Sequence, residues 1–111
     1  MAISKYHNVT GATGVDVELI APGSKGNNLS SVMLTNVHAT ADATVTLFIQ
    51  DNPTASASST FNIIHTIAIP ADSSLLLDNS SVLSFDNSSS TSFGLYITVG
   101  SSDTVDVLLG I

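Results

Sequence analysis

Residues 61–78, FNIIHTIAIPADSSLLLD, decide the fold class of this chain. The odd positions of the first half share one face of an extended chain: Phe61, Ile63, His65, Ile67 and Ile69. Pro70 then interrupts the run, because proline has no N–H for a sheet ladder. Apolar alternation resumes at Leu75 and Leu77. The stretch predicts a β-hairpin with a short polar connection of about four residues.

The first strand of this hairpin is apolar on both faces, since Ile64 and Ala68 occupy even positions. A strand with two apolar faces is typical of the centre of a sheet or of a strand covered by a partner. We therefore expect a strand that is central in its sheet or covered by a partner, with Ile67 in the core and His65 at the rim of the core. A catalytic or ligand role and a pH-sensitive interface are the alternatives for His65.

The rest of the chain has the same period-two pattern, broken every eight to twelve residues or so by Gly, Pro, Asn, Asp and Ser. Further strands are predicted at residues 3–9, 15–19, 29–37, 43–50, 82–85, 93–99 and 105–111. The fold class is therefore all-β: one antiparallel β-sandwich of eight or nine short strands, jelly-roll-like or immunoglobulin-like. Residues 1–111 form one domain, in which 1–14 is a weak strand or an N-terminal arm, and no helix exceeds one or two turns.

Composition restricts the partners. Only 10% of the 111 residues are charged, against about 25% in typical domains. Lys5 and Lys25 are the only basic residues, and the net charge is −7. Nucleic acid and anionic membranes attract clustered Lys and Arg, so neither is expected as a partner. Cysteine is absent, and neither a secretory signal nor a membrane-spanning stretch is recognisable, so we expect synthesis in the cytoplasm.

No catalytic motif is present, and we predict neither an enzyme nor a cofactor. His7, His38 and His65 are isolated in the sequence. Asp-Asn pairs follow apolar strands at residues 51–52, 78–79 and 86–87. Their side chains favour turns, with calcium binding as the alternative, so no metal site is predicted. Without tryptophan, a carbohydrate site is not indicated either.

Some apolar side chains stand on the face opposite the inward residues of their strands. Phe48 shares the polar face of its strand with Thr44 and Thr46, Tyr96 lies on the face opposite Leu95 and Ile97, and Leu108 shares a face with Asp106. Apolar side chains on a solvent face often cover an interface. The predicted interface residues are Phe48, Ile64, Tyr96 and Leu108.

Three segments together carry a resemblance: LSSVMLTNVHATADATVTLFIQD (29–51), FNIIHTIAIPADSSLLLD (61–78) and FGLYITVGSSDTVDVLLGI (93–111). This pattern over residues 15–111 resembles small virion proteins of tailed bacteriophages, particularly those of cyanobacteria. The shared feature is a strand ending in Ile-Pro, a short turn and an apolar strand, followed by two further strands. The resemblance supplies no residue-level site.

The resemblance implies a non-enzymatic structural protein. We expect a capsid decoration, or cement, protein on the capsid surface of a virion. It would bind outside the major capsid lattice and stabilise the head. Its partners would be the major capsid protein or other virion proteins, and it would form a homo-oligomer, with a trimer as one option. The alternatives are a tail, neck or fibre module, or a carbohydrate- or calcium-binding attachment sandwich.

Overall fold

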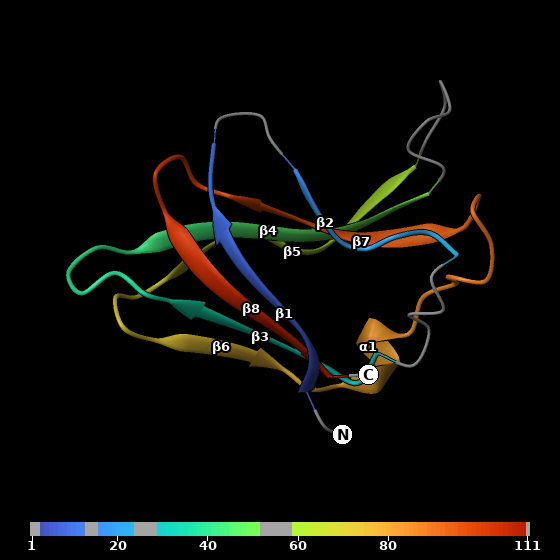
Figure 1. Ribbon diagram of the computed structural model, residues 1–111, viewed down its shortest axis with the longest axis horizontal. Coiled ribbons are helices and arrows are strands. Elements are labelled where there is room, and N and C mark those ends of the chain that lie inside the picture. Colours follow the sequence, from blue (N-terminus) through green and yellow to red (C-terminus); the bar gives the residue numbers. More distant parts are fainter. Residues whose placement is uncertain (1–2, 13–15, 24–28, 52–58, 111) are drawn as a thin grey trace.

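The computed structural model describes residues 3–12, 16–23, 29–51 and 59–110. These residues form eight strands and one helical turn (Figure 1). The elements are β1 (Ile3–Thr10), β2 (Val17–Ile20), β3 (Ser31–Asn36), β4 (Ala43–Asp51), β5 (Thr60–Ile69), β6 (Ser74–Leu77), α1 (Ser80–Leu83), β7 (Phe93–Val99) and β8 (Thr104–Gly110).

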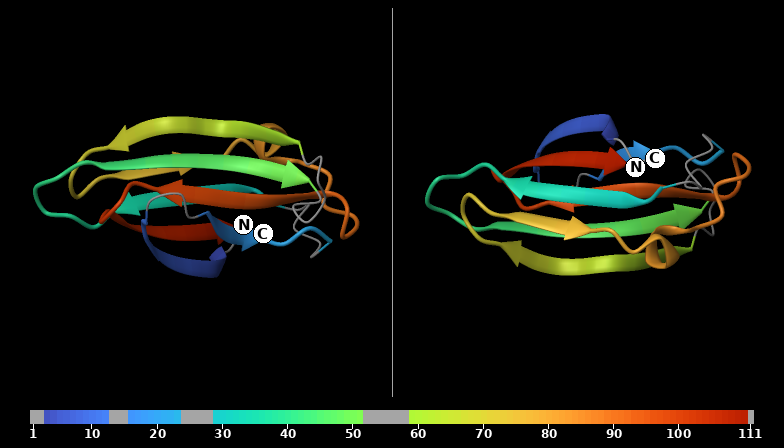
Figure 2. Two further views of the ribbon diagram at one scale, coloured as in Figure 1. Left: turned by 90° about the horizontal axis from the view of Figure 1, so that it is seen from above. Right: turned by 90° about the horizontal axis from the view of Figure 1, so that it is seen from below.

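The strands form two antiparallel sheets, β1-β8-β3-β6 and β2-β7-β4-β5, which pack face to face (Figure 2). The pairs β1·β8, β2·β7, β3·β6 and β4·β5 are nested, as in one long hairpin rolled onto itself. The contacts β3·β8 and β4·β7 complete the sheets. This order is that of an eight-stranded jelly roll. The predicted β-sandwich is confirmed, with the jelly-roll form rather than the immunoglobulin form.

The core lies between the sheets and is almost wholly aliphatic, because inward positions alternate with outward ones along each strand. Its fully covered members include Val32, Leu34, Val45, Leu47, Leu95, Ile97, Val105, Val107 and Leu109. The burial predicted for Leu95 is confirmed. No helix among the described residues is long and apolar enough to cross a membrane.

The predicted strand at residues 82–85 is wrong, because residues 80–83 form the helical turn α1. Asn79 caps this turn by accepting a hydrogen bond from the Ser81 N–H at 3.0 Å. Such caps favour a helical start, since the first N–H groups of a helix have no partner within it. The turn brings Leu83 into the core, where it is fully covered.

The predicted hairpin between β5 and β6 is also wrong. Although adjacent in sequence, β5 pairs with β4 in one sheet and β6 pairs with β3 in the other. Residues 70–73 therefore cross between the sheets. Asp72 has a positive φ of 53°, and its N–H donates to the carbonyl of His38 at 2.9 Å. The apolar alternation identified two strands correctly, but the tight crossover resembles a hairpin turn in sequence.

The strand β5 lies at the edge of its sheet, so the predicted central position is wrong. Its pairing with β4 shifts register twice, and Thr66 takes a positive φ of 54° at one irregularity. An extra residue on one strand reverses which side chains face inward. The extra residue therefore brings Ile64 inward and leaves His65 exposed. Ile69 is covered, whereas Ile67 is 43% exposed although it pairs with the buried Val45, because β5 is an edge strand. The core position predicted for Ile67 and the rim position predicted for His65 are both wrong.

The two chain ends described by the structure lie side by side in one sheet. β1 pairs with β8 along its length, so residues 3–10 form a strand rather than an arm. Gly11 follows directly, and its N–H donates to the carbonyl of Asp103 at 2.8 Å. A Cβ on Gly11 would stand 2.1 Å from the carbonyl oxygen of Gly100, so only glycine fits this approach.

The buried Asn36 ties the two sheets together. Its Nδ2 donates to the carbonyl of Ile69, on the opposite sheet, at 2.9 Å and to the carbonyl of Ala41 at 2.8 Å. Its Oδ1 accepts from the His38 N–H at 2.9 Å. Asn36 is completely covered, so these bonds replace those that water would supply.

Candidate functional site

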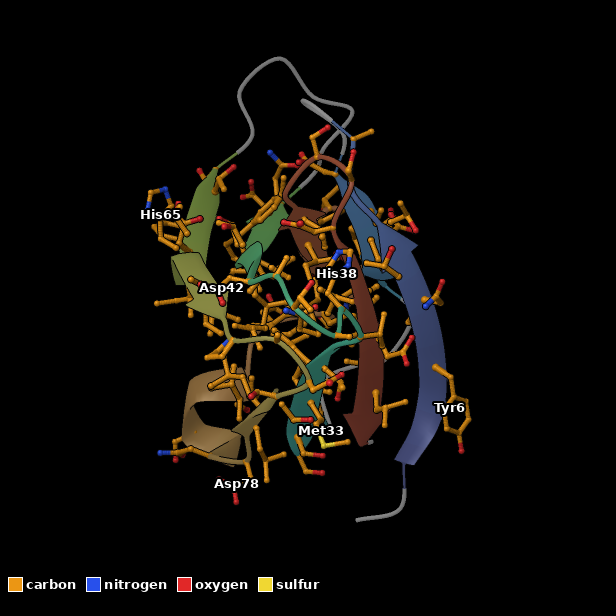
Figure 3. All side chains as sticks on the ribbon, turned by 90° about the vertical axis from the view of Figure 1, so that its left-hand side faces the viewer. Tyr6, Met33, His38, Asp42, His65 and Asp78 are labelled. Carbon is orange, nitrogen blue, oxygen red and sulfur yellow. The ribbon has the colours of Figure 1, made fainter. Side chains whose placement is uncertain are left out.

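The three histidines lie on different segments: His7 on β1, His38 after β3 and His65 on β5. Figure 3 shows His65 pointing outward at one side of the sandwich, well apart from His38. The His38 Nε2 lies 3.8 Å from Asp103 Oδ1, while the other Asp103 oxygen accepts the Thr44 N–H at 3.2 Å. This arrangement joins the segments after β3 and β7 to the start of β4 at one end of the fold.

The Asp-Asn pairs stabilise turns within the chain. Asp86 Oδ1 accepts from both the hydroxyl (2.6 Å) and the N–H (3.1 Å) of Ser88, and these bonds hold the Asp86 pKa below its usual value. Asn87 Nδ2 donates to the carbonyls of Ala21 and Phe93. In the described ranges, no group of three or more acidic or histidine side chains could hold a metal ion. Asn52 lies outside the described residues.

The four predicted interface residues do not come together. Ile64 belongs to the core. Phe48 and Tyr96 lie on the outer face of the β2-β7-β4-β5 sheet, whereas Leu108 lies on the outer face of the other sheet. The four residues therefore do not form one patch.

The chain itself covers Phe48 and Tyr96. Their rings stack with centroids 5.7 Å apart, and each residue is only 6% exposed. The Tyr96 hydroxyl donates to Glu18 Oε2 at 3.4 Å. The two aromatic residues form a small second cluster on the back of the sheet, so they are not available as an exposed patch.

The Tyr96 pKa is raised above its usual 10.0, first by burial of the ring and then by the nearby Glu18 carboxylate. The folded chain therefore keeps this proton at a pH where the unfolded chain releases it, and stability falls as pH rises above about 10. We expect Tyr96→Phe to reduce this alkaline loss, which urea unfolding at about pH 9 and about pH 11 would measure. In Tyr6→Phe, a control at an exposed tyrosine, the loss should persist. Identical pH profiles for the two variants would contradict this assignment.

The outer face of the β1-β8-β3-β6 sheet carries a continuous apolar row. Tyr6 pairs with Leu108, Leu108 with Met33, and Met33 with Leu76, so the row crosses all four strands. Tyr6 is 68% exposed and Leu76 is 55% exposed, while the two central residues are half-buried. Figure 2 (right) shows these strands side by side, and Figure 3 shows Tyr6 pointing away from the molecule.

Polar groups that bind one another flank the apolar row. The next outward-facing row, two residues along each strand, is polar. There Asn8 Nδ2 donates to Asp106 Oδ1 at 2.6 Å, and the hydroxyls of Thr35 and Ser74 lie 2.8 Å apart. Asp106 is thus the charged residue nearest the centre of the face, and a side-chain amide already binds it. A partner would therefore meet apolar side chains beside polar groups whose hydrogen bonds are largely satisfied, which lowers the cost of removing water.

A pocket of about 140 Å³ lies at the end of the apolar row, lined by Leu76, Leu77, Asp78 and Asn79. Its two leucines make it partly apolar, and Asp78 places a carboxylate at its wall. A pocket of this size accepts one side chain of a partner rather than a small-molecule substrate, which needs a cavity of about 300 Å³ or more.

Of the predicted residues, only Leu108 belongs to the apolar row. Tyr6, Met33 and Leu76 were missed, although each stands opposite the inward positions of its strand, as Leu108 does. Their alignment depends on the pairing register of three strand pairs that are distant in sequence.

Comparisons with protein-family models, with curated proteins and with solved structures find no match to this chain.

Proposed function

We propose that this protein is a non-enzymatic virion structural component, most specifically a decoration protein that binds the outside of a major capsid lattice and stabilises the head. The observation that carries this proposal is the apolar row across one entire sheet face. The sequence resemblance to small bacteriophage virion proteins supports it independently.

The charge distribution also supports a protein partner. The chain has nine acidic and two basic residues, which is unfavourable for contact with packaged DNA and compatible with an outer capsid surface. Ser, Thr and Asn flank the apolar row, so contact with a lattice removes few charges from water. The row itself would supply binding energy at about 25 cal/mol per Å² of apolar area, part of which is lost to the cost of association.

The area of the face limits how tightly one copy can bind. Four strands about 4.8 Å apart, with about six residues of about 3.4 Å each on average, give roughly 400 Å². A stable interface needs about 800 Å² on each partner. Single copies should therefore bind weakly, and tight decoration requires several linked contacts.

We expect Tyr6→Ser to weaken binding to particles that lack this protein by about tenfold or more, because aromatic residues dominate interface energies. The measurement is cosedimentation of purified protein with such particles over a range of concentrations. Phe61→Ser is the matched control, since Phe61 is an exposed aromatic (58%) on the edge strand of the other sheet. Equal binding by the two variants would show that the apolar row is not part of the interface.

Copy number separates decoration from the tail, neck or fibre alternative. Quantitative mass spectrometry of purified particles should give a number comparable to that of capsid lattice sites. A number matching a single tail or neck ring would contradict the decoration role while leaving a structural role intact.

A further inference from the structure

The four edge strands of the sandwich differ in how they discourage pairing with another chain. β1 and β2 each show a register shift in their pairing, and β2 carries Glu18. β5 has two shifts and the strained Thr66. Bulges and charges on edge strands prevent association of sheets, because they twist the edge or leave a charge without water.

β6 is short, but it has neither a register shift nor a charge. Its residues, Ser74–Leu77, pair with β3 in continuous register and carry no charge. Among the described edge strands, it alone combines regular pairing with the absence of charged side chains. In Figure 1 it runs along the lower border of the molecule, away from β1 at the other edge of the same sheet.

We propose that β6 pairs antiparallel with β6 of a second copy of this chain, joining two four-stranded sheets into one of eight strands. A second copy is the occupant that fits best, because Ser74–Leu77 carries no charge, and two chains of net charge −7 can meet there with Ser74, rather than a second carboxylate, opposite Asp78. Opposed residues of an antiparallel pair share a face, so keeping both outer faces on one side requires a residue to oppose its own copy. One of the two such registers nearest the centre of β6 places Leu76 beside Leu76 of the second copy and Ser74 beside Asp78.

This pairing would extend the apolar row. A two-fold axis perpendicular to the sheet keeps both outer faces on the same side. The row would then run from Tyr6 through Leu76 of one copy to Leu76 and Tyr6 of the other. The combined face of roughly 800 Å², twice the area calculated from strand spacing, reaches the about 800 Å² that a stable interface needs on each side. The inference that the dimer enlarges a capsid-binding face rests on the proposed function. The inference that β6 pairs with β6 does not.

Engineered cysteines test the pairing directly, because the natural chain has no cysteine. Directly opposed residues of antiparallel strands have Cα atoms about 4.5 or 5.5 Å apart, within the range that a disulfide bridges. Leu76→Cys should therefore form a covalent dimer under mild oxidation. Phe61→Cys, on the bulged edge β5, and Ser74→Cys, which would face Asp78 rather than itself, should crosslink far more slowly.

Sedimentation of the unmodified protein provides the second measurement. Four residues offer few ladder bonds, so we expect a reversible dimer whose average mass rises from 11.4 kDa toward twice that value with concentration. Leu76→Lys and Leu76→Glu should each be monomeric, and an equimolar mixture of the two should dimerise. A wild-type chain that stays monomeric, or a Leu76→Cys variant that crosslinks no faster than Phe61→Cys, would overturn the proposal.

These outcomes are independent of the particle assay. A protein that remains monomeric but still decorates particles refutes the β6 dimer and leaves the proposed function intact. A dimer that fails to bind particles supports the β6 pairing and contradicts the decoration role.

Discussion

Replacing Leu95 by alanine should lower the free energy of unfolding by about 2–5 kcal/mol, the range for deletion of a buried aliphatic side chain. Leu95 is completely covered on β7, a central strand of its sheet. The loss combines the transfer free energy of the removed methyl groups with the cavity they leave. Urea unfolding followed by circular dichroism would measure it.

Ile67→Ala is the matched control for this prediction. Ile67 belongs to the same sheet, but it is 43% exposed on the edge strand β5. Its truncation should cost clearly less, about 1–2 kcal/mol, since only about half of its surface is covered and no closed cavity is left. Similar losses for the two variants would mean that β5 is covered more fully than the structure shows.

Replacing Asn36 by aspartate should cost about 3 kcal/mol or more. In place of the Nδ2 donor, an oxygen would face the carbonyls of Ala41 and Ile69, 2.8 and 2.9 Å away in the native structure. Each buried polar group left without its partner costs about 1–3 kcal/mol, and a buried carboxylate adds its own desolvation. Because the lost bond to Ile69 links the two sheets, thermal unfolding should shift markedly to lower temperature.

Asn62→Asp provides the corresponding surface control. Asn62 is exposed on β5, and the same substitution there should change stability by no more than about 0.5 kcal/mol. The penalty at Asn36 should also persist in Asn36→Ala, which removes the donor without adding a charge. If alanine were tolerated there, the hydrogen bonds of Asn36 would not be the link between the sheets that their geometry indicates.

The sequence predicted most strands because inward and outward side chains alternate wherever one face of a sheet is buried. Residues 43–50, 93–99 and 105–111 show this alternation clearly, and the corresponding strands β4, β7 and β8 begin and end within one residue of those ranges. The prediction of Leu95 as a core residue follows from the same periodicity. The predicted strand at residues 82–85 failed because a local cap at Asn79 stabilises a helical turn instead.

Sequence alone thus determined an all-β sandwich, an acidic charge-poor surface and the outward position of Leu108. Tertiary structure decided that β5 and β6 belong to different sheets, that the edge position of β5 exposes Ile67, and that Phe48 and Tyr96 cover one another. It also aligned Tyr6, Leu108, Met33 and Leu76 into one row. The physical reason is that alternation fixes which side of its own strand a residue occupies. Pairing between segments up to a hundred residues apart fixes its neighbours, and no local pattern encodes that register.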